Sequence, residues 1–289
     1  MQFGIQIFPT DQTIQPIELG KACEERGFES LWFAEHSHIP ISRETPFNRS
    51  PDAPPLPEKY WRTHDTIVAL TAVAASTERL RLGTGISLVA QHDPIWMAKQ
   101  VASIDQMSAG RFLLGVGYGW NVEEMRGHSV DFKRRRDVLR EKILTMRSLW
   151  TEEVAAFQGE HVNLEPSWAW PKPAQRPHPP ILLGAPLGPK TLAHLVEFCD
   201  GWIPNRLYIS DLDSKVDSIR AALEEADRDP DQFIFTLYST PDESLDYLAS
   251  LQKLGFERVI FPVESLPPRE VLTRLDQLAD IVEKYRGCA

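Results

Sequence analysis

Short apolar runs alternate with amphipathic stretches along most of the chain, and each pair predicts a strand followed by a helix. In the first half, the expected strands are FGIQIF (3–8), SLWFAE (30–35), LRLGTGISLV (80–89) and RFLLGVG (111–117). The expected helices cover residues 14–27, 64–77, 93–110 and a segment that is most regular over 134–150. The third helix has clear boundaries, because Asp93 and Pro94 favour a helix start and Gly110 favours a helix end.

The second half of the chain repeats this alternation. The expected strands are PILLG (180–184), DGWIP (200–204), QFIFTLYS (232–239) and RVIFPV (258–263), and the expected helices cover 189–198, 211–227, 241–254 and 268–285. Recurrent strand–helix units imply a parallel sheet, and eight units in a chain of 289 residues predict an α/β fold, the (β/α)8 TIM barrel. A doubly wound open sheet is the alternative, although such sheets more often have roughly five to seven strands.

Two stretches interrupt the alternation. Residues 40–62, after the second strand, are polar and rich in proline, and residues 151–179, between the fourth and fifth strands, carry Trp168, Trp170 and several prolines. Because strand–helix units resume on each side, we expect residues 1–289 to form one domain with two long loop insertions. Loops that follow barrel strands lie on the active face, so each insertion is either a functional loop or a plain surface excursion.

The charge balance argues against two classes of partner. The chain has 41 acidic and 31 basic residues and a net charge of −10, which disfavours nucleic acid or an anionic membrane surface. The N-terminal segment lacks the pattern of a secretory signal, and no apolar run is long enough to span a membrane. Three widely separated cysteines fit a reducing compartment rather than a disulfide scaffold, so we expect a cytoplasmic protein.

The stretch FAEHSHIP (33–40) places Glu35, His36 and His38 at the end of the second strand. Such a cluster could bind a metal, transfer a proton or receive a cofactor. The two histidines would point to the same side of an extended segment, as in barrel metallohydrolases. However, the third, fourth and fifth strands end without His, Cys or Asp. We therefore disfavour a metal site.

Glycines follow the fourth and fifth strands, in LGVGYGW (114–120) and ILLGAPLGPKT (181–191). The first stretch lacks the later glycine and the distant acidic residue of a dinucleotide fingerprint, but its glycines permit close approach of a flat ligand. In the second stretch, Gly184 to Thr191 form a loop of small residues before a helix, which suits a phosphate or is an ordinary turn. Two glycines in LGTGISL (82–88) indicate a bulge that could back a flat ligand.

The stretch GTGISLVAQHDPIWMAKQVASIDQMSAGRFLLGVGYGW, followed by PPILLGAP and CDGWIP, resembles the bacterial luciferase-like family of flavin and deazaflavin oxidoreductases. It is most similar to the branch that uses coenzyme F420, and the resemblance covers the chain except loops 40–62 and 151–179. The resemblance implies hydride transfer between F420 and a small organic substrate, and a homodimer. The alternatives are a reduced-FMN monooxygenase that uses oxygen, a non-catalytic flavin-binding member, and a metal-dependent hydrolase.

The resemblance also implies roles for individual residues. His36 would lie beside the reactive edge of the ring system with Glu35 as its orienting carboxylate, and His38 would have no role. A non-prolyl cis peptide would fall at Gly85–Ile86, behind the middle ring. The cofactor-binding residues would be Gly85, Ile86, Gly117, Tyr118, Gly119, Trp120, Gly184, Ala185, Pro186, Leu187 and Gly188.

One departure from the family pattern bears on the substrate. Sugar-phosphate dehydrogenases of the family carry a proton-donating Glu after the glycines of the fourth strand, where this chain has Trp120. Glu123 and Glu124 follow, but we expect them in the first turn of a helix capped by Asn121. Glucose-6-phosphate dehydrogenase activity is therefore disfavoured, and an apolar or planar substrate is favoured.

Basic residues in the first insertion bear on the cofactor. Arg43, Lys59 and Arg62 could contact the polyglutamate tail of F420.

Overall fold

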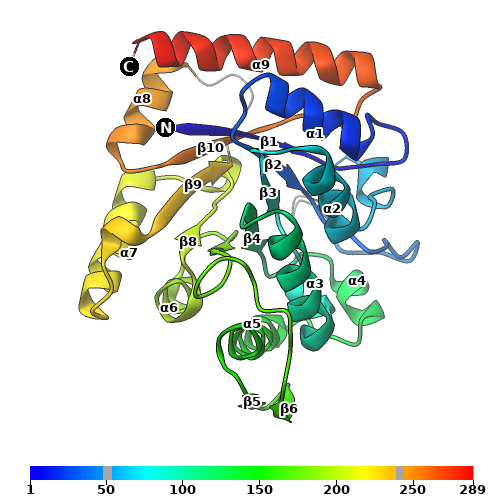
Figure 1. Ribbon diagram of the computed structural model, residues 1–289, viewed down its shortest axis with the longest axis vertical. Coiled ribbons are helices and arrows are strands. Elements are labelled where there is room, and N and C mark those ends of the chain that lie inside the picture. Colours follow the sequence, from blue (N-terminus) through cyan, green and yellow to red (C-terminus); the bar gives the residue numbers. More distant parts are fainter. Residues whose placement is uncertain (48–53, 239–243, 289) are drawn as a thin grey trace.

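In the computed structural model, the described residues are 1–47, 54–238 and 244–288, and they contain a closed barrel of parallel strands (Figure 1). The strands are β1 (Gln2–Ile7), β2 (Ser30–Phe33), β3 (Arg81–Thr84), β4 (Phe112–Val116), β7 (Ile181–Leu183), β8 (Gly201–Trp202), β9 (Ile234–Tyr238) and β10 (Arg258–Pro262). Their order around the barrel is β1-β10-β9-β8-β7-β4-β3-β2. The prediction of a (β/α)8 TIM barrel is confirmed.

Helices follow the strands and lie outside the barrel, as Figure 1 shows. They are α1 (Pro16–Glu25), α2 (Thr66–Ser76), α3 (Pro94–Met107), α4 (Val122–Gly127), α5 (Arg135–Thr151), α6 (Pro189–Phe198), α7 (Leu212–Glu225), α8 (Leu245–Lys253) and α9 (Pro268–Cys288). The expected strand 232–239 and helix 241–254 fall partly on residues 239–243, which lie outside the described residues. Among the described helices, none is both long and apolar enough to cross a membrane.

Side-chain caps begin several of these helices where the sequence predicts them. The Asp93 carboxylate accepts hydrogen bonds from the backbone N–H groups of Ile95 and Trp96 at the start of α3. The Asn121 side chain does the same for Glu123 and Glu124 at the start of α4, as expected. These bonds satisfy backbone donors that have no partner within the helix.

A small apolar cluster lies inside the barrel. It consists of Trp32, Leu113, Leu182, Ile203 and Ile260. The indole of Trp32 fits because Gly83 has no side chain, since a Cβ atom at that glycine would lie 2.1 Å from the ring. Trp32, Ile203 and Ile260 of this cluster also line a cavity.

The two insertions differ in structure. Residues 48–53 of the first insertion lie outside the described residues, and the remainder includes a short 3-10 helix, Glu58–Tyr60. The second insertion contains an antiparallel pair that the sequence pattern did not predict, β5 (Ala155–Gln158) and β6 (Asn163–Ser167). The Glu141 carboxylate of α5 holds this hairpin by accepting hydrogen bonds from the N–H groups of residues 160–162.

Candidate active site

A cavity of about 520 Å³ opens at the carboxyl ends of the barrel strands. Trp32 and Ile260 of the interior cluster line it, together with residues from the loops that follow β1, β2, β3, β4 and β7. Active sites of TIM barrels lie at this end, because the loops after the strands converge there. We call it the mouth cavity.

Most residues predicted from the sequence line the mouth cavity. These are Glu35, His36, Gly85, Ile86, Tyr118, Gly119, Trp120, Gly184, Ala185, Pro186, Leu187 and Gly188. Gly117 is not among the lining residues and lies behind Ile86, where a Cβ atom would be 2.3 Å from Cδ1 of that side chain. His38 also lies outside the lining and contacts Ser37 and His128 instead.

The predicted bulge is present after β3. The Gly85–Ile86 peptide is cis, as expected, and pairing with β4 resumes at Ser87, whose N–H donates to the Gly115 carbonyl at 2.8 Å. The Ile86 side chain lies against Gly184, where a Cβ atom would be 2.7 Å from its Cγ2. Gly117 after β4 and Gly184 after β7 therefore leave room for Ile86, which forms an apolar shelf in the mouth cavity.

A buried hydrogen bond connects His36 to Glu124 of α4. The Nδ1–H of His36 donates to Glu124 Oε2 at 2.8 Å, and the two side chains are 6% and 1% exposed. The second carboxylate oxygen of Glu124 accepts the N–H of Ser37 at 3.2 Å. Within the described part of the chain, Nε2 of His36 has no hydrogen-bond partner, so this nitrogen is available to a molecule in the mouth cavity.

Glu35 has a different set of partners from the one expected. Its carboxylate lies 2.7 Å from His92 Nε2, accepts the Ser87 hydroxyl at 2.7 Å and accepts the Leu88 N–H at 2.9 Å. Burial raises the pKa of this carboxyl, but the hydrogen bonds and the His92 charge outweigh burial and hold the pKa below its usual value. Glu35 therefore anchors the chain after the bulge, while Glu124 orients His36.

Three aromatic rings lie around His36, and a fourth, Phe47, packs against two of them. We call these four side chains the aromatic wall: Phe8, Phe47, Tyr60 and Trp120. The ring centroids of Tyr60 and Trp120 lie 5.1 and 6.1 Å from that of His36, and all four rings line the mouth cavity. Burial raises the pKa of Tyr60 to about 12, so its hydroxyl remains protonated at neutral pH.

The other end of the mouth cavity is cationic. Arg135 and Arg136, in the first turn of α5, line it together with Gly188, which precedes α6. The Arg136 guanidinium lies 4.7 Å from the ring centroid of Tyr118. Two guanidinium groups and the amino end of a helix suit a phosphate. These arginines are not predictable as site residues from the sequence, because a basic run at a helix start usually faces solvent.

The basic residues of the first insertion already have partners. Arg62 donates two hydrogen bonds to Asp11 at 2.8 and 2.7 Å, and Lys59 lies 2.5 Å from Glu264. Arg43 donates to the Thr45 carbonyl. Contacts with a polyglutamate tail would have to replace these interactions. In the described residues, no group of three or more His, Cys, Asp and Glu side chains could hold a metal ion.

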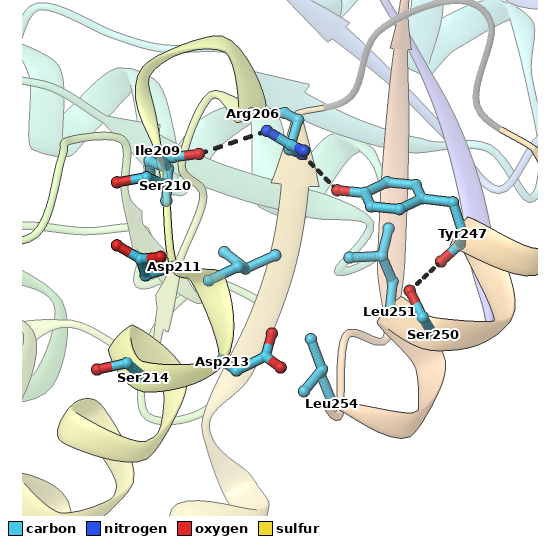
Figure 2. A pocket seen from close by; sticks show the side chains of 11 residues that line it. Arg206, Ile209, Ser210, Asp211, Asp213, Ser214, Tyr247, Ser250, Leu251 and Leu254 are labelled. Carbon is cyan, nitrogen blue, oxygen red and sulfur yellow. Dashed lines mark hydrogen bonds between the residues drawn. The ribbon is translucent and has the colours of Figure 1, made fainter.

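A second cavity, of about 530 Å³, lies between α8 and the segment that leads into α7 (Figure 2). Arg206 borders it and donates to the Tyr247 hydroxyl at 2.6 Å. Two aspartates, Asp211 and Asp213, also line it, which disfavours a phosphate. None of the predicted site residues lines this cavity, so the mouth cavity is the candidate active site.

Comparison with known protein sequences gives matches along nearly the whole chain. The profile of the family described as luciferase-like monooxygenase matches residues 9–241. An uncharacterized protein of Mycobacterium tuberculosis is 37% identical over 281 residues, covering 96% of this chain and 98% of that protein. A 5,10-methylenetetrahydromethanopterin reductase of Methanolobus tindarius is 24% identical over 274 residues, covering 95% and 74%. An FMNH2-dependent dimethylsulfone monooxygenase of Pseudomonas putida is 30% identical over 166 residues, covering 55% and 44%.

Solved structures share the fold. A monooxygenase of Streptomyces bottropensis has a TM-score of 0.80 at 19% identity, covering 99% of this chain and 100% of that one. A coenzyme F420 dependent tetrahydromethanopterin reductase of Methanopyrus kandleri has a TM-score of 0.74 at 18% identity, covering 97% of each chain. At this identity the likeness is one of fold.

Proposed function

The chain belongs to the luciferase-like monooxygenase family, and from this premise we propose that it is a coenzyme F420-dependent oxidoreductase. It would transfer a hydride between the deazaflavin and a small organic substrate. The observation that carries the proposal is the buried His36–Glu124 pair, which faces a cavity with one cationic end and one aromatic end. A flat, phosphate-bearing redox cofactor and an organic substrate together match these two ends.

The residues of the mouth cavity fit such a cofactor. Gly85, Ile86 and Gly119 would hold the flat ring system on the shelf described above, and the loop 184–188 with Arg136 would hold the phosphate. When bound, the deazaflavin supplies the hydride donor or acceptor. The protein supplies binding, orientation and a proton partner.

His36 is the proposed proton partner. Its Nε2 would take the hydroxyl proton when a substrate alcohol loses hydride from carbon, and would return the proton when a carbonyl gains hydride. Glu124 would hold the proton on Nδ1 and stabilise the imidazolium that forms. Glu35 and His92 would keep the chain after β3 in place beside the ring.

A reduced-FMN monooxygenase is the second candidate. It is supported by the Pseudomonas putida relative, whose name includes FMNH2. FMN has the same kind of tricyclic ring and a phosphate, so the same cavity residues would hold it.

We also propose that residues 1–289 form one domain and act as a homodimer in the cytoplasm. Cys23, Cys199 and Cys288 are free thiols, which supports a reducing compartment. Large apolar side chains are exposed on the packed helices α2 and α3, with Val68 67% and Trp96 69% exposed. An apolar face of this kind supports a subunit interface.

The test is a titration of the purified protein with F420 and, separately, with FMN, followed by fluorescence quenching. We expect tight binding of F420 and weaker binding of FMN. Preference for FMN would replace the proposal with the monooxygenase, and binding of neither would reject both cofactors. In parallel, His36→Ala should abolish turnover without loss of F420 binding, and unchanged turnover would reject its role.

A further inference from the structure

Resting on the proposed function, we propose that the aromatic wall is the substrate subsite. It takes a neutral, apolar ring compound that carries a carbonyl or hydroxyl oxygen. The Tyr60 hydroxyl donates a hydrogen bond to that oxygen, and Trp120 covers the ring.

The two ends of the mouth cavity differ in chemistry, so each end suits a different ligand. The cationic end is formed by Arg135, Arg136 and the start of α6, and it suits the phosphate of the cofactor. The aromatic wall lies around His36, and its members follow β1 and β4 or belong to the first insertion. The proton partner of the reaction is therefore at the end where rings, not cations, line the cavity.

The rings of the aromatic wall form a continuous apolar surface. The ring centroid of Tyr60 lies 4.7 Å from that of Phe8, 5.3 Å from that of Phe47 and 6.1 Å from that of Trp120. All four side chains are only partly buried, so surface remains for contact with a ligand. Flat apolar molecules bind such surfaces through burial of area and ring–ring contact.

Charged groups near the wall already have partners: Lys59 is paired with Glu264, and Arg43 donates to the Thr45 carbonyl. Glu124 is paired with His36, and Glu35 is paired with His92. Lys59 and Arg43 contact the rings of Phe8 and Trp120 but do not line the mouth cavity. A charged substrate would lose its hydration here without gaining a free partner, which is costly. The wall therefore selects neutral molecules.

Tyr60 supplies the polar contact that fixes the substrate. Its hydroxyl has no hydrogen-bond partner within the described residues. The side chain lines the cavity, and its ring centroid lies 5.1 Å from that of His36. A neutral phenol beside His36 can donate to a substrate oxygen while the imidazole exchanges the proton.

The experiment uses acetophenone, its charged analogue 4-acetylbenzoate and its oxygen-free analogue ethylbenzene. Binding is measured by calorimetry on the protein saturated with oxidised F420, so that no turnover occurs. We expect acetophenone to bind about tenfold or more tighter than 4-acetylbenzoate. Tyr60→Phe should weaken the binding of acetophenone about two- to tenfold and leave the binding of ethylbenzene unchanged. Trp120→Ala should weaken the binding of both neutral compounds, acetophenone and ethylbenzene.

Trp61→Ala is the matched control, because Trp61 is the neighbour of Tyr60 and does not line the mouth cavity. It should leave all three affinities unchanged. The subsite proposal would be overturned if 4-acetylbenzoate bound as tightly as acetophenone or more tightly. It would also be overturned if neither Tyr60→Phe nor Trp120→Ala changed the affinity for acetophenone. The fluorescence titration with F420 tests the proposed function separately from the substrate subsite. If F420 does not bind, the proposed function is rejected, and the same calorimetry on the protein without cofactor still tests whether the aromatic wall binds acetophenone.

Discussion

His36 and Glu124 are 88 positions apart in the chain, yet the Nδ1–H of His36 donates to Glu124 Oε2 at 2.8 Å in a buried setting. The short helix α4 makes this contact, because its cap at Asn121 fixes the first turn and directs Glu124 inward. A carboxylate on one ring nitrogen fixes the tautomer and leaves the other nitrogen for the reaction. Glu124 is therefore a positioning residue.

Glu124→Gln should lower turnover by roughly ten- to a hundredfold, because the imidazolium loses its carboxylate partner. F420 affinity should stay unchanged, since Glu124 does not line the mouth cavity. Steady-state kinetics with an alcohol or ketone that supports turnover measures the first effect, and a fluorescence titration with F420 measures the second.

The control is Glu123→Gln. Glu123 is the adjacent residue, but its carboxylate accepts hydrogen bonds from the backbone and hydroxyl of Thr45 in the first insertion. This variant should change KM more than kcat. Nitrogen NMR of the imidazole adds a readout that needs no turnover, since the signal of the Nδ1–H that bonds to the carboxylate should shift only in Glu124→Gln. Equal losses of kcat in the two variants would contradict the positioning role.

Arg136→Ala should weaken the binding of FMN and F420 by about tenfold, because a guanidinium at the cationic end is removed. Riboflavin, which has the FMN ring without the phosphate, should bind both proteins equally. Arg140→Ala is the control one turn along α5, where the guanidinium is paired with Glu197. Equal losses of FMN and riboflavin affinity would show that Arg136 does not act on the phosphate.

Gly184→Ala should cost about 1–3 kcal/mol of folding free energy, because its Cβ would lie 2.7 Å from Ile86 Cγ2 in a packed site. In an Ile86→Ala background, the same change should cost little, since the obstructing group is absent. Urea unfolding of the four proteins in this double-mutant cycle measures the coupling. Strictly additive costs would mean that Gly184 does not make room for Ile86.

Periodicity was sufficient to predict the barrel, because the strands are buried on both faces and produce continuous apolar runs. It was less reliable where local contacts override pattern. The expected strand 80–89 ends at Thr84, since the cis peptide at Gly85 redirects the chain before pairing resumes at Ser87. The β5–β6 hairpin escaped prediction because it is short and depends on hydrogen bonds to Glu141, which lies in α5.

The site residues that directly follow barrel strands were predictable from the sequence. Glu35, His36 and the glycines of β4 and β7 follow strands, and a barrel brings all such positions to one mouth. The choice between two carboxylates for His36 was not predictable. Glu35 is adjacent in sequence but bonds to His92, and Glu124 reaches His36 only through the packing of α4. Adjacent residues in an extended chain point to opposite sides, which favours the distant partner.

Trp96→Glu should convert the proposed dimer into a monomer. A charge placed on the exposed apolar face of α3 would be buried without a partner if that face is the interface. Leu207→Glu is the control, because Leu207 is similarly exposed, at 68%, but precedes α7. Analytical ultracentrifugation distinguishes the states. A monomeric parent protein would reject the dimer, and a dimeric Trp96→Glu variant would place the interface elsewhere.

Acid should destabilise the protein partly through His194, which fixes Tyr118 by accepting its hydroxyl at 2.8 Å. Burial lowers the pKa of His194 from 6.5 to about 4, so between these values the unfolded chain binds a proton that the folded chain does not. The contribution of His194 to the stability of the folded state is therefore fully present above pH 6.5 and is lost progressively as the pH falls toward 4. His194→Asn keeps a hydrogen-bond acceptor and removes the titration, so its unfolding free energy should decline less over this range. Urea unfolding at a series of pH values tests this, and parallel declines in the two proteins would exclude His194 as the cause.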